Sequence, residues 1–172
     1  MKSLFSFFMF LAVAVSACGQ QDKSKRPSPP ALAKETIASG ATISIDYSQP
    51  SVKGRTIGKD LEPMTGKVWR TGANEATVFE TDKAVTVQGQ ALPAGKYGLF
   101  TLVGEDGSWT IIFNKTWNQW GAFNYKEADD VLRVKGDAGK APSAAEKMTF
   151  QIAKDGKVTL LWADQAVSFM VK

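Results

Sequence analysis

The side chains best suited to chemistry gather in two segments that lack a regular apolar pattern. In the second of them, residues 114–130 (NKTWNQWGAFNYKEADD), aromatic rings alternate with amide side chains. Rings stack on the apolar faces of sugars and amides hydrogen-bond to hydroxyl groups, so this composition is typical of a glycan-binding groove. The alternative is that Trp117 and Trp120 plug the open end of a β-sandwich, because tryptophan is highly buried on average. The candidate ligand-binding residues of this segment are Asn114, Lys115, Trp117, Gln119, Trp120 and Tyr125.

The first segment, residues 54–75, ends in a string that contains Arg70, Asn74 and Glu75. An arginine side chain presents a planar fork that matches carboxylate or phosphate, and the other two residues could complete a polar cluster with it. The alternative is a structural ion pair, Arg70 with Glu75 or Asp46, that holds the loop to a sheet. Both interpretations stay open at this level.

Composition excludes the commonest catalytic centres. The chain has one cysteine and no histidine, so neither a Ser-His-Asp or Cys-His site nor a zinc site can be built from it, and no internal disulfide can form. The net charge of +4 includes no basic run of the kind that binds nucleic acid. We find no P-loop, nucleophile elbow or EF-hand spacing. We therefore expect no metal, no cofactor and no nucleic-acid partner.

The single cysteine follows a short apolar leader. Residues 1–17 start with a basic Lys2, and their apolar centre, residues 4–15, is 12 residues long. A membrane-spanning helix needs about 20 residues, so this length favours a cleaved secretory signal peptide. The VSAC string at residues 15–18 matches the lipobox of bacterial lipoproteins, in which Cys18 is acylated before cleavage. An ordinary signal peptide with a chance cysteine is the alternative.

The residues after Cys18 predict a location and a tether. Gly19 and Gln20 follow it with no aspartate at the second position, which resembles the sorting pattern for the outer membrane of Gram-negative bacteria. Residues 18–37 are polar and proline-rich, a composition that cannot offset its ordering entropy by burial. We predict a flexible tether over 18–37 and a folded domain over 38–172, held to the membrane by lipid on Cys18.

The folded part has the two-residue period of antiparallel strands. Apolar and polar residues alternate, and segments such as LFTLV and TIIF are apolar at nearly every position, which indicates strands covered on both sides or strands at the centre of a sandwich. Turn signals such as Asp155-Gly156 separate these segments. The pattern predicts an all-β domain, a single antiparallel β-sandwich of Ig-like or jelly-roll-like type with eight or nine strands, and one short helical turn around residues 144–147. The alternating segments are 43–47, 85–88, 97–103, 109–113, 148–152, 158–162 and 167–171.

Five blocks resemble a known family in sequence and order. They are YSQPSVKGR (47–55), GKVWRTGANEAT (66–77), LPAGKYGLFTL (92–102), WTIIFNKTWNQWGAFNY (109–125) and DVLRVK (130–135). Together they resemble the domain-of-unknown-function 2911 family, secreted proteins and lipoproteins of Bacteroidetes-type bacteria. No activity is assigned to this family, so no catalytic residues can be carried over from the resemblance. The resemblance implies that family motifs include Arg55, Trp69, Arg70, Asn74, Glu75, Asn114, Lys115, Trp120 and Tyr125.

These observations predict a lipid-anchored envelope protein whose β-domain is a non-catalytic binding or scaffold module for a glycan or an envelope protein. Two alternatives stay open. One is an enzyme of unfamiliar type that uses an arginine–glutamate or carboxylate-pair site, and the other is a purely structural partner of an outer-membrane complex.

Overall fold

The computed structural model describes residues 22–172, so the predicted leader and Cys18 lie outside the described residues. Within this range the chain forms strands and two short 3₁₀ turns, η1 (Lys23–Lys25) and η2 (Glu127–Asp129). No helix in this range is long and apolar enough to span a bilayer. The strands are β1 (Pro30–Thr36), β2 (Thr42–Ser48), β3 (Val68–Trp69), β4 (Val78–Thr81), β5 (Val85–Val87), β6 (Gln90–Leu92), β7 (Gly95–Val103), β8 (Trp109–Asn114), β9 (Asp130–Ile152) and β10 (Lys157–Met170).

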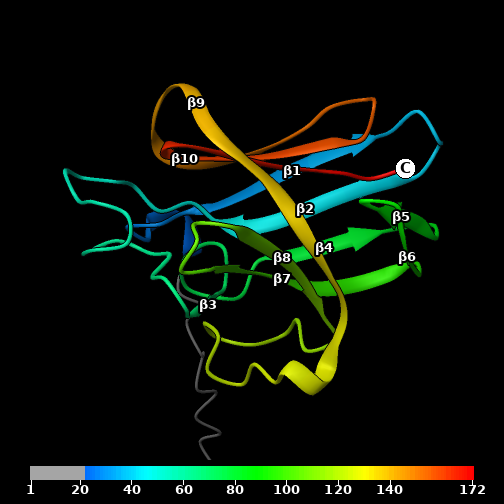
Figure 1. Cartoon of the computed structure of the whole chain (residues 1–172), viewed down its shortest axis with the longest axis horizontal. Helices are drawn as coiled ribbons and strands as arrows, with labels where there is room; N and C mark the ends of the chain where they lie inside the picture. Colours follow the sequence, from blue (N-terminus) through cyan, green and yellow to red (C-terminus); the bar gives the residue numbers. More distant parts are fainter. Residues whose placement is uncertain (1–21) are drawn as a thin grey trace, which may run out of the picture.

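All named strand pairs are antiparallel, in the order β1-β2-β4-β7-β8-β9-β10, with β3 beside β7 and a separate β5-β6 hairpin. The long strand β9 folds this sheet over itself. Its first part, from Asp130 to Gly136, pairs with β8, and its second part pairs with β10. Figure 1 shows β9 crossing from the lower layer, beside β8, to the upper layer, beside β10. The predicted all-β, sandwich-like class is confirmed.

The main core lies between these layers. Phe113 on β8 packs edge-on against Phe79 on β4, with ring centroids 5.0 Å apart, and against Phe169 on β10, at 5.9 Å. Such edge-to-face pairs stabilise a core beyond the area that they bury. The predicted turn at Asp155-Gly156 joins β9 to β10, and Gly156 has a φ of +91°, which a glycine adopts without strain.

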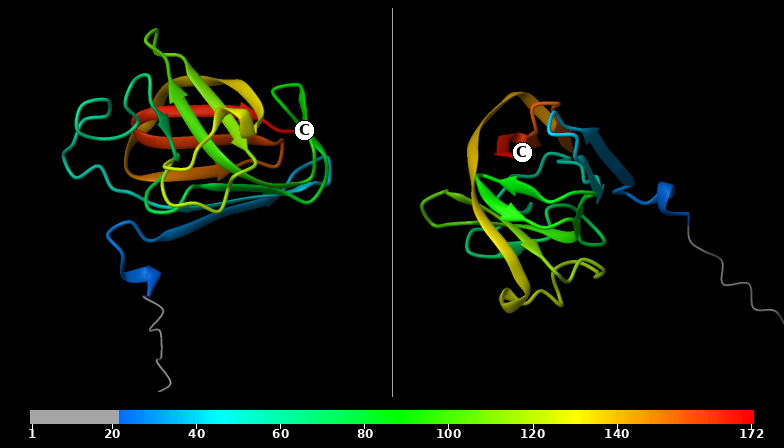
Figure 2. Two further views of the ribbon diagram at one scale, coloured as in Figure 1. Left: turned by 90° about the horizontal axis from the view of Figure 1, so that it is seen from below. Right: turned by 90° about the vertical axis from the view of Figure 1, so that its right-hand side faces the viewer.

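A smaller core lies on the outer face of β7 and β8. Phe100 and Ile112 are fully buried there, together with Ala76, and Ala122 and Tyr125 from the following loop pack over them. The loop of residues 115–129, named the cover loop here, therefore forms a lid over this sheet face (Figures 1 and 2). This confirms the prediction that the nearly fully apolar strand segments are covered on both sides.

Two local predictions were wrong. Residues 30–36, assigned to a flexible tether, form edge strand β1 and pair with β2 over their whole length. Ala31 and Ala33 pack on the main core while Leu32 points outward, so a modest apolar face and backbone pairing order this proline-containing segment. Residues 144–147, expected as a helical turn, lie within β9 because pairing with β10 and the 50–52 segment overrides a local alanine preference.

Candidate functional site

The two segments singled out from the sequence lie side by side. The backbone N–H of Ala76 donates to the carbonyl of Gln119, at 2.9 Å, and that of Gly121 donates to the carbonyl of Asn74, also at 2.9 Å. These bonds fix the cover loop against the end of the first segment. The fold thus brings the backbones of residues 70–77 and 117–123 together, but the candidate side chains of these segments do not converge on one site.

Arg70 has a charged side chain with no partner in the part of the chain that the structure describes. Within residues 22–172, its buried Nε makes no hydrogen bond, and no carboxylate oxygen lies within 4.0 Å of its guanidinium nitrogens. Burial lowers the pKa of Arg70, and the negative charge of Glu62 offsets only part of this effect. An arginine nevertheless stays protonated, so Arg70 carries a partly desolvated positive charge and N–H donors that are free to bind an acceptor.

Two adjoining cavities meet at Arg70. The larger has a volume of about 330 Å³ and the smaller of about 270 Å³, and both are lined by Glu62, Trp69 and Arg70. The larger cavity also has Arg55 and Trp162 in its wall, whereas the smaller one extends to Phe123 of the cover loop. We call the two together the Arg70 cavities.

A glycine of the cover loop makes room for this guanidinium. Gly121 has a φ of +63°, and a Cβ at this position would lie 2.9 Å from Nη1 of Arg70. A side chain there would strain the backbone and push the guanidinium from its place. The cover loop and the Arg70 cavities therefore form one structural unit.

The predicted cluster of Arg70 with Glu75 does not form, and neither does the alternative ion pair between them. Glu75 instead bonds to the N-terminal segment: Nη1 of Arg26 lies 3.0 and 2.9 Å from its two carboxylate oxygens, and Nζ of Lys23 lies 3.0 Å from Oε1. Asp46 lines the small cavity beside Glu75 and forms no ion pair with Arg70 within 4.0 Å. The predicted pairs were wrong because Glu75 is bound instead by a basic segment whose Arg26 lies 49 residues earlier in the chain.

Acid should weaken this contact. Burial raises the pKa of Glu75, but hydrogen bonds from Lys23 and Arg26 outweigh it and hold the pKa at about 2, against 4.5 for the free group. The folded protein therefore binds fewer protons than the unfolded chain, so this contribution is complete above pH 4.5 and is lost as the pH falls towards 2. Urea unfolding at pH 6 and pH 2.5 measures the acid loss, the decrease in the free energy of unfolding between these two pH values. The acid loss should be smaller in Glu75→Gln than in the wild type, by less than about 1 kcal/mol because the carboxylate is 38% exposed. In the exposed control Glu105→Gln the acid loss should equal that of the wild type; an equal loss in Glu75→Gln would contradict the assignment.

The aromatic rings of the cover loop are exposed. Trp117 is 37%, Trp120 52% and Phe123 80% accessible to solvent, so the interpretation that the tryptophans plug the end of the sandwich was wrong. A cation lies over each indole: Nζ of Lys96 is 5.6 Å from the Trp117 ring, and Cζ of Arg26 is 5.8 Å from the Trp120 ring. Neither tryptophan lines the Arg70 cavities, so no single groove joins the indoles to Arg70.

Buried amides hold the cover loop in this shape. Gln119 is almost fully buried; its Nε2 donates to the carbonyl of Thr116, at 2.7 Å, and its Oε1 accepts from the N–H of Asn124, at 3.0 Å. Asn114, with no exposed surface, donates through Nδ2 to the carbonyl of Lys126 and to Oδ1 of Asp130, and accepts from the N–H of Thr116. Both amides are thus used within the protein rather than offered to a ligand.

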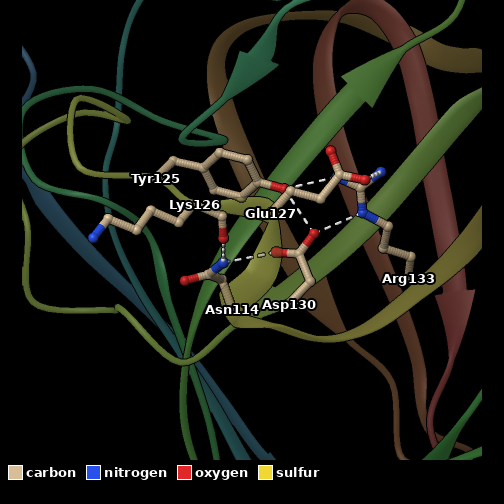
Figure 3. A network of polar contacts seen from close by, with 6 residues as sticks. All are labelled: Asn114, Tyr125, Lys126, Glu127, Asp130 and Arg133. Atoms are coloured by element: carbon tan, nitrogen blue, oxygen red, sulfur yellow. Dashed lines mark hydrogen bonds and ion pairs between the residues drawn. The ribbon is translucent and has the colours of Figure 1, made fainter.

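A polar network continues from Asn114 to the start of β9 (Figure 3). The hydroxyl of Tyr125 donates to Oδ2 of Asp130 at 2.7 Å, and Arg133 donates to both of these atoms, at 2.7 and 2.6 Å. Burial, and then the hydrogen bond to Asp130, raises the pKa of Tyr125 to about 12. The phenol therefore stays protonated at neutral pH and serves as a structural donor that ties the cover loop to β9.

The remaining candidates have local roles. Arg55 donates to the carbonyls of Ser51 and Val52, and Trp69 is buried with its indole N–H on the carbonyl of Gly72. Asn74 donates through Nδ2 to the carbonyl of Ser28, and Lys115 is exposed. Arg55, Trp69 and Arg70 are the sequence-predicted residues that the structure gathers around one space, the larger of the Arg70 cavities.

A scan against protein-family models matches residues 28–171 to DUF2911, a protein of unknown function. The chain belongs to the DUF2911 family. The match begins just before β1 and therefore includes the strand that the sequence-based tether prediction left out. No curated protein matches the chain, and no solved structure does. The DUF2911 domain has no group of three or more histidine, cysteine, aspartate or glutamate residues placed to hold a metal ion in the part that the structure describes.

Sequence reasoning missed four residues of this DUF2911 site. Arg26 and Phe123 carried a weak signal, since one is among four arginines and the other lies in the aromatic segment. Glu62 and Gly121 carried none, because their roles depend on where the fold places them relative to Arg70.

Proposed function

We propose that this DUF2911 protein is a lipid-anchored envelope protein whose β-domain is a non-catalytic module that binds a carboxylate-bearing glycan at the Arg70 cavities. The observation that carries the ligand assignment is the unpartnered guanidinium of Arg70 at the meeting point of two cavities. A ligand carboxylate would supply the missing acceptors, and an arginine fork binds carboxylate through two parallel hydrogen bonds. The anchor assignment rests on the lipobox string that ends at Cys18.

The lining of the cavities supports a sugar rather than a simple anion. In the larger cavity, Asp60 and Glu62 provide hydrogen-bond acceptors for hydroxyl groups, and Trp69 and Trp162 provide the apolar part of the wall. A volume of about 330 Å³ falls in the range of small-molecule sites. Sugars that carry a free carboxylate, such as uronates and muramic acid units from which the stem peptide has been removed, combine both requirements.

The positions of the carboxylates favour binding over catalysis. Glu75, the acid expected beside Arg70, is held by Arg26 and Lys23 at a different cavity. Asp60 and Glu62 each accept a backbone N–H of their own turn, at 2.6 and 2.8 Å.

The test is titration calorimetry with soluble peptidoglycan sugars, released by a muramidase and stripped of their stem peptides by an amidase so that the muramic acid carboxylate is free. The wild-type protein should bind them, and Arg70→Met should bind at least about tenfold more weakly, because hydrogen bonds between charged groups contribute about 1.5–3 kcal/mol each. Fragments with methyl-esterified carboxylates should lose binding to the same extent. The control Lys59→Met removes an exposed positive charge from the same segment and should bind like wild type.

Unfolding of the same variants separates binding from structure. Arg70→Met removes a charge that has no partner, so its free energy of unfolding should be unchanged within about 0.5 kcal/mol or should rise. A loss above about 2 kcal/mol would make Arg70 a structural residue. Equal binding of free and esterified fragments would overturn the carboxylate assignment.

A further inference from the structure

The exposed apolar residues of the domain are concentrated on the cover loop. Of the four large hydrophobic side chains that are exposed in the described part of the chain, Trp117, Trp120 and Phe123 lie within seven residues, and Leu32 lies elsewhere, on β1. The loop that carries them is fixed by Asn114, by Gln119 and by the Tyr125 network. Its rings are therefore held out in solvent by an ordered backbone.

The start of the described chain lies against this loop. The guanidinium of Arg26 sits over the Trp120 ring, and Lys23 and Arg26 both bond to Glu75, which forms a backbone bridge with Trp120. Asn74 additionally holds the carbonyl of Ser28. The segment that leads away from the domain towards Cys18 is thereby attached to the aromatic side of the molecule.

The short segment between Cys18 and Asp22 limits how far the domain can lie from the membrane. Asp22 is four residues after Cys18, and four extended residues span at most about 14 Å. An acylated Cys18 lies at the membrane surface, so Asp22 and the neighbouring cover loop would be held within a short distance of the lipid headgroups. The domain could not turn its aromatic side far from the bilayer without breaking the ion pairs of Glu75.

We infer that the exposed aromatic face of the cover loop, Trp117, Trp120 and Phe123, docks on the lipid bilayer to which Cys18 is anchored. Tryptophan prefers the interface between hydrocarbon and water, and lysines such as the exposed Lys115 and Lys126 place their charges among headgroups while their stems lie along apolar surface. This inference rests on the anchor of the proposed function but not on its glycan ligand. Docking would orient the domain, with the Phe123 wall of the Arg70 cavities at the membrane surface.

The tryptophans of the chain provide the measurement. Trp69, Trp109 and Trp162 are at most 4% exposed, so only two of the five tryptophans can report contact with lipid. The mature chain, residues 18–172, is coupled through its single thiol to a maleimide lipid in vesicles of phosphatidylethanolamine and phosphatidylglycerol at 3:1. Phosphatidylcholine brominated in its acyl chains is then added as a quencher. Emission should fall by up to two fifths, and the Trp117→Phe/Trp120→Phe double variant should show no such loss.

Two outcomes would overturn docking. One is emission that bromolipid leaves unchanged while acrylamide in the water quenches it. The other is quenching that persists in the double variant, because the signal would then come from buried rings. A shift of the exposed tryptophan emission on adding peptidoglycan fragments, with no bromolipid quenching, would assign the aromatic face to a glycan instead. Coupling through maleimide makes these results independent of native acylation, which mass spectrometry of the protein from bacterial membranes tests separately.

Discussion

Replacing Asn114 with alanine should lower the free energy of unfolding by about 3 kcal/mol. The side chain has no exposed surface and makes three hydrogen bonds, at 2.9 Å to the carbonyl of Lys126, at 2.7 Å to Asp130 and at 2.8 Å from the N–H of Thr116. The substitution leaves all three partners short of a hydrogen bond in a site where water is largely excluded. The cost of unsatisfied buried groups, rather than the loss of packing, makes the effect large.

Chemical denaturation followed by far-UV circular dichroism measures this loss. The matched control is Asn118→Ala, an amide that is four residues further along and exposed, for which the change should stay within about 0.5 kcal/mol. Acrylamide should also quench the fluorescence of Trp117 and Trp120 more strongly in Asn114→Ala than in the wild type, since the network fixes the loop that carries these rings. Equal stabilities of the two variants would show that the amide does not organise the cover loop.

Replacing Phe100 with alanine should cost about 3–5 kcal/mol, the range observed for the loss of a buried phenylalanine ring. Phe100 is fully buried on the outer face of β7 and stacks at a tilt on Tyr125, with ring centroids 5.1 Å apart. Its removal leaves a cavity beneath the cover loop, in the small core that Phe100 forms with Ile112 and Ala76. We therefore expect weaker binding at the Arg70 cavities as well, because Ala122 and Phe123 line one of them.

The matched control for this substitution is Phe123→Ala. It removes the same ring from a side chain that is 80% exposed, so stability should change by no more than about 0.5 kcal/mol. Urea unfolding of both variants, compared with wild type, decides the matter. A small effect of Phe100→Ala would mean that the cover loop does not depend on the outer core, and the site would lose its structural basis.

The all-β class and the double coverage of β7 and β8 were predictable from the sequence, because both depend on local order. A two-residue period shows which face of a strand is buried, and a strand with apolar residues on both faces must be covered on both faces. The turn at Asp155-Gly156 was predictable for the same reason, since a positive φ is a property of one residue. The family, too, was apparent from blocks of contiguous residues, and its model covers residues 28–171.

The assignment of β1 needed the structure. Residues 30–36 contain one proline and two inward-facing alanines, too little apolar surface to predict order from composition. Their order comes from backbone hydrogen bonds to β2, and backbone groups pair with little regard to the side chains that sequence patterns report.

The sequence by itself determined which residues are able to bind a ligand, and only the tertiary structure decided which of them are free to do so. Asn114, Gln119 and Tyr125 have the chemistry of ligand-binding groups, but their hydrogen bonds hold the cover loop in place. Glu75 is neutralised by Arg26. The side-chain donors of Arg70 have no acceptor among residues 22–172. The physical reason is that donors and acceptors find partners by distance in space, and the partner of Glu75 lies 49 residues away in the chain.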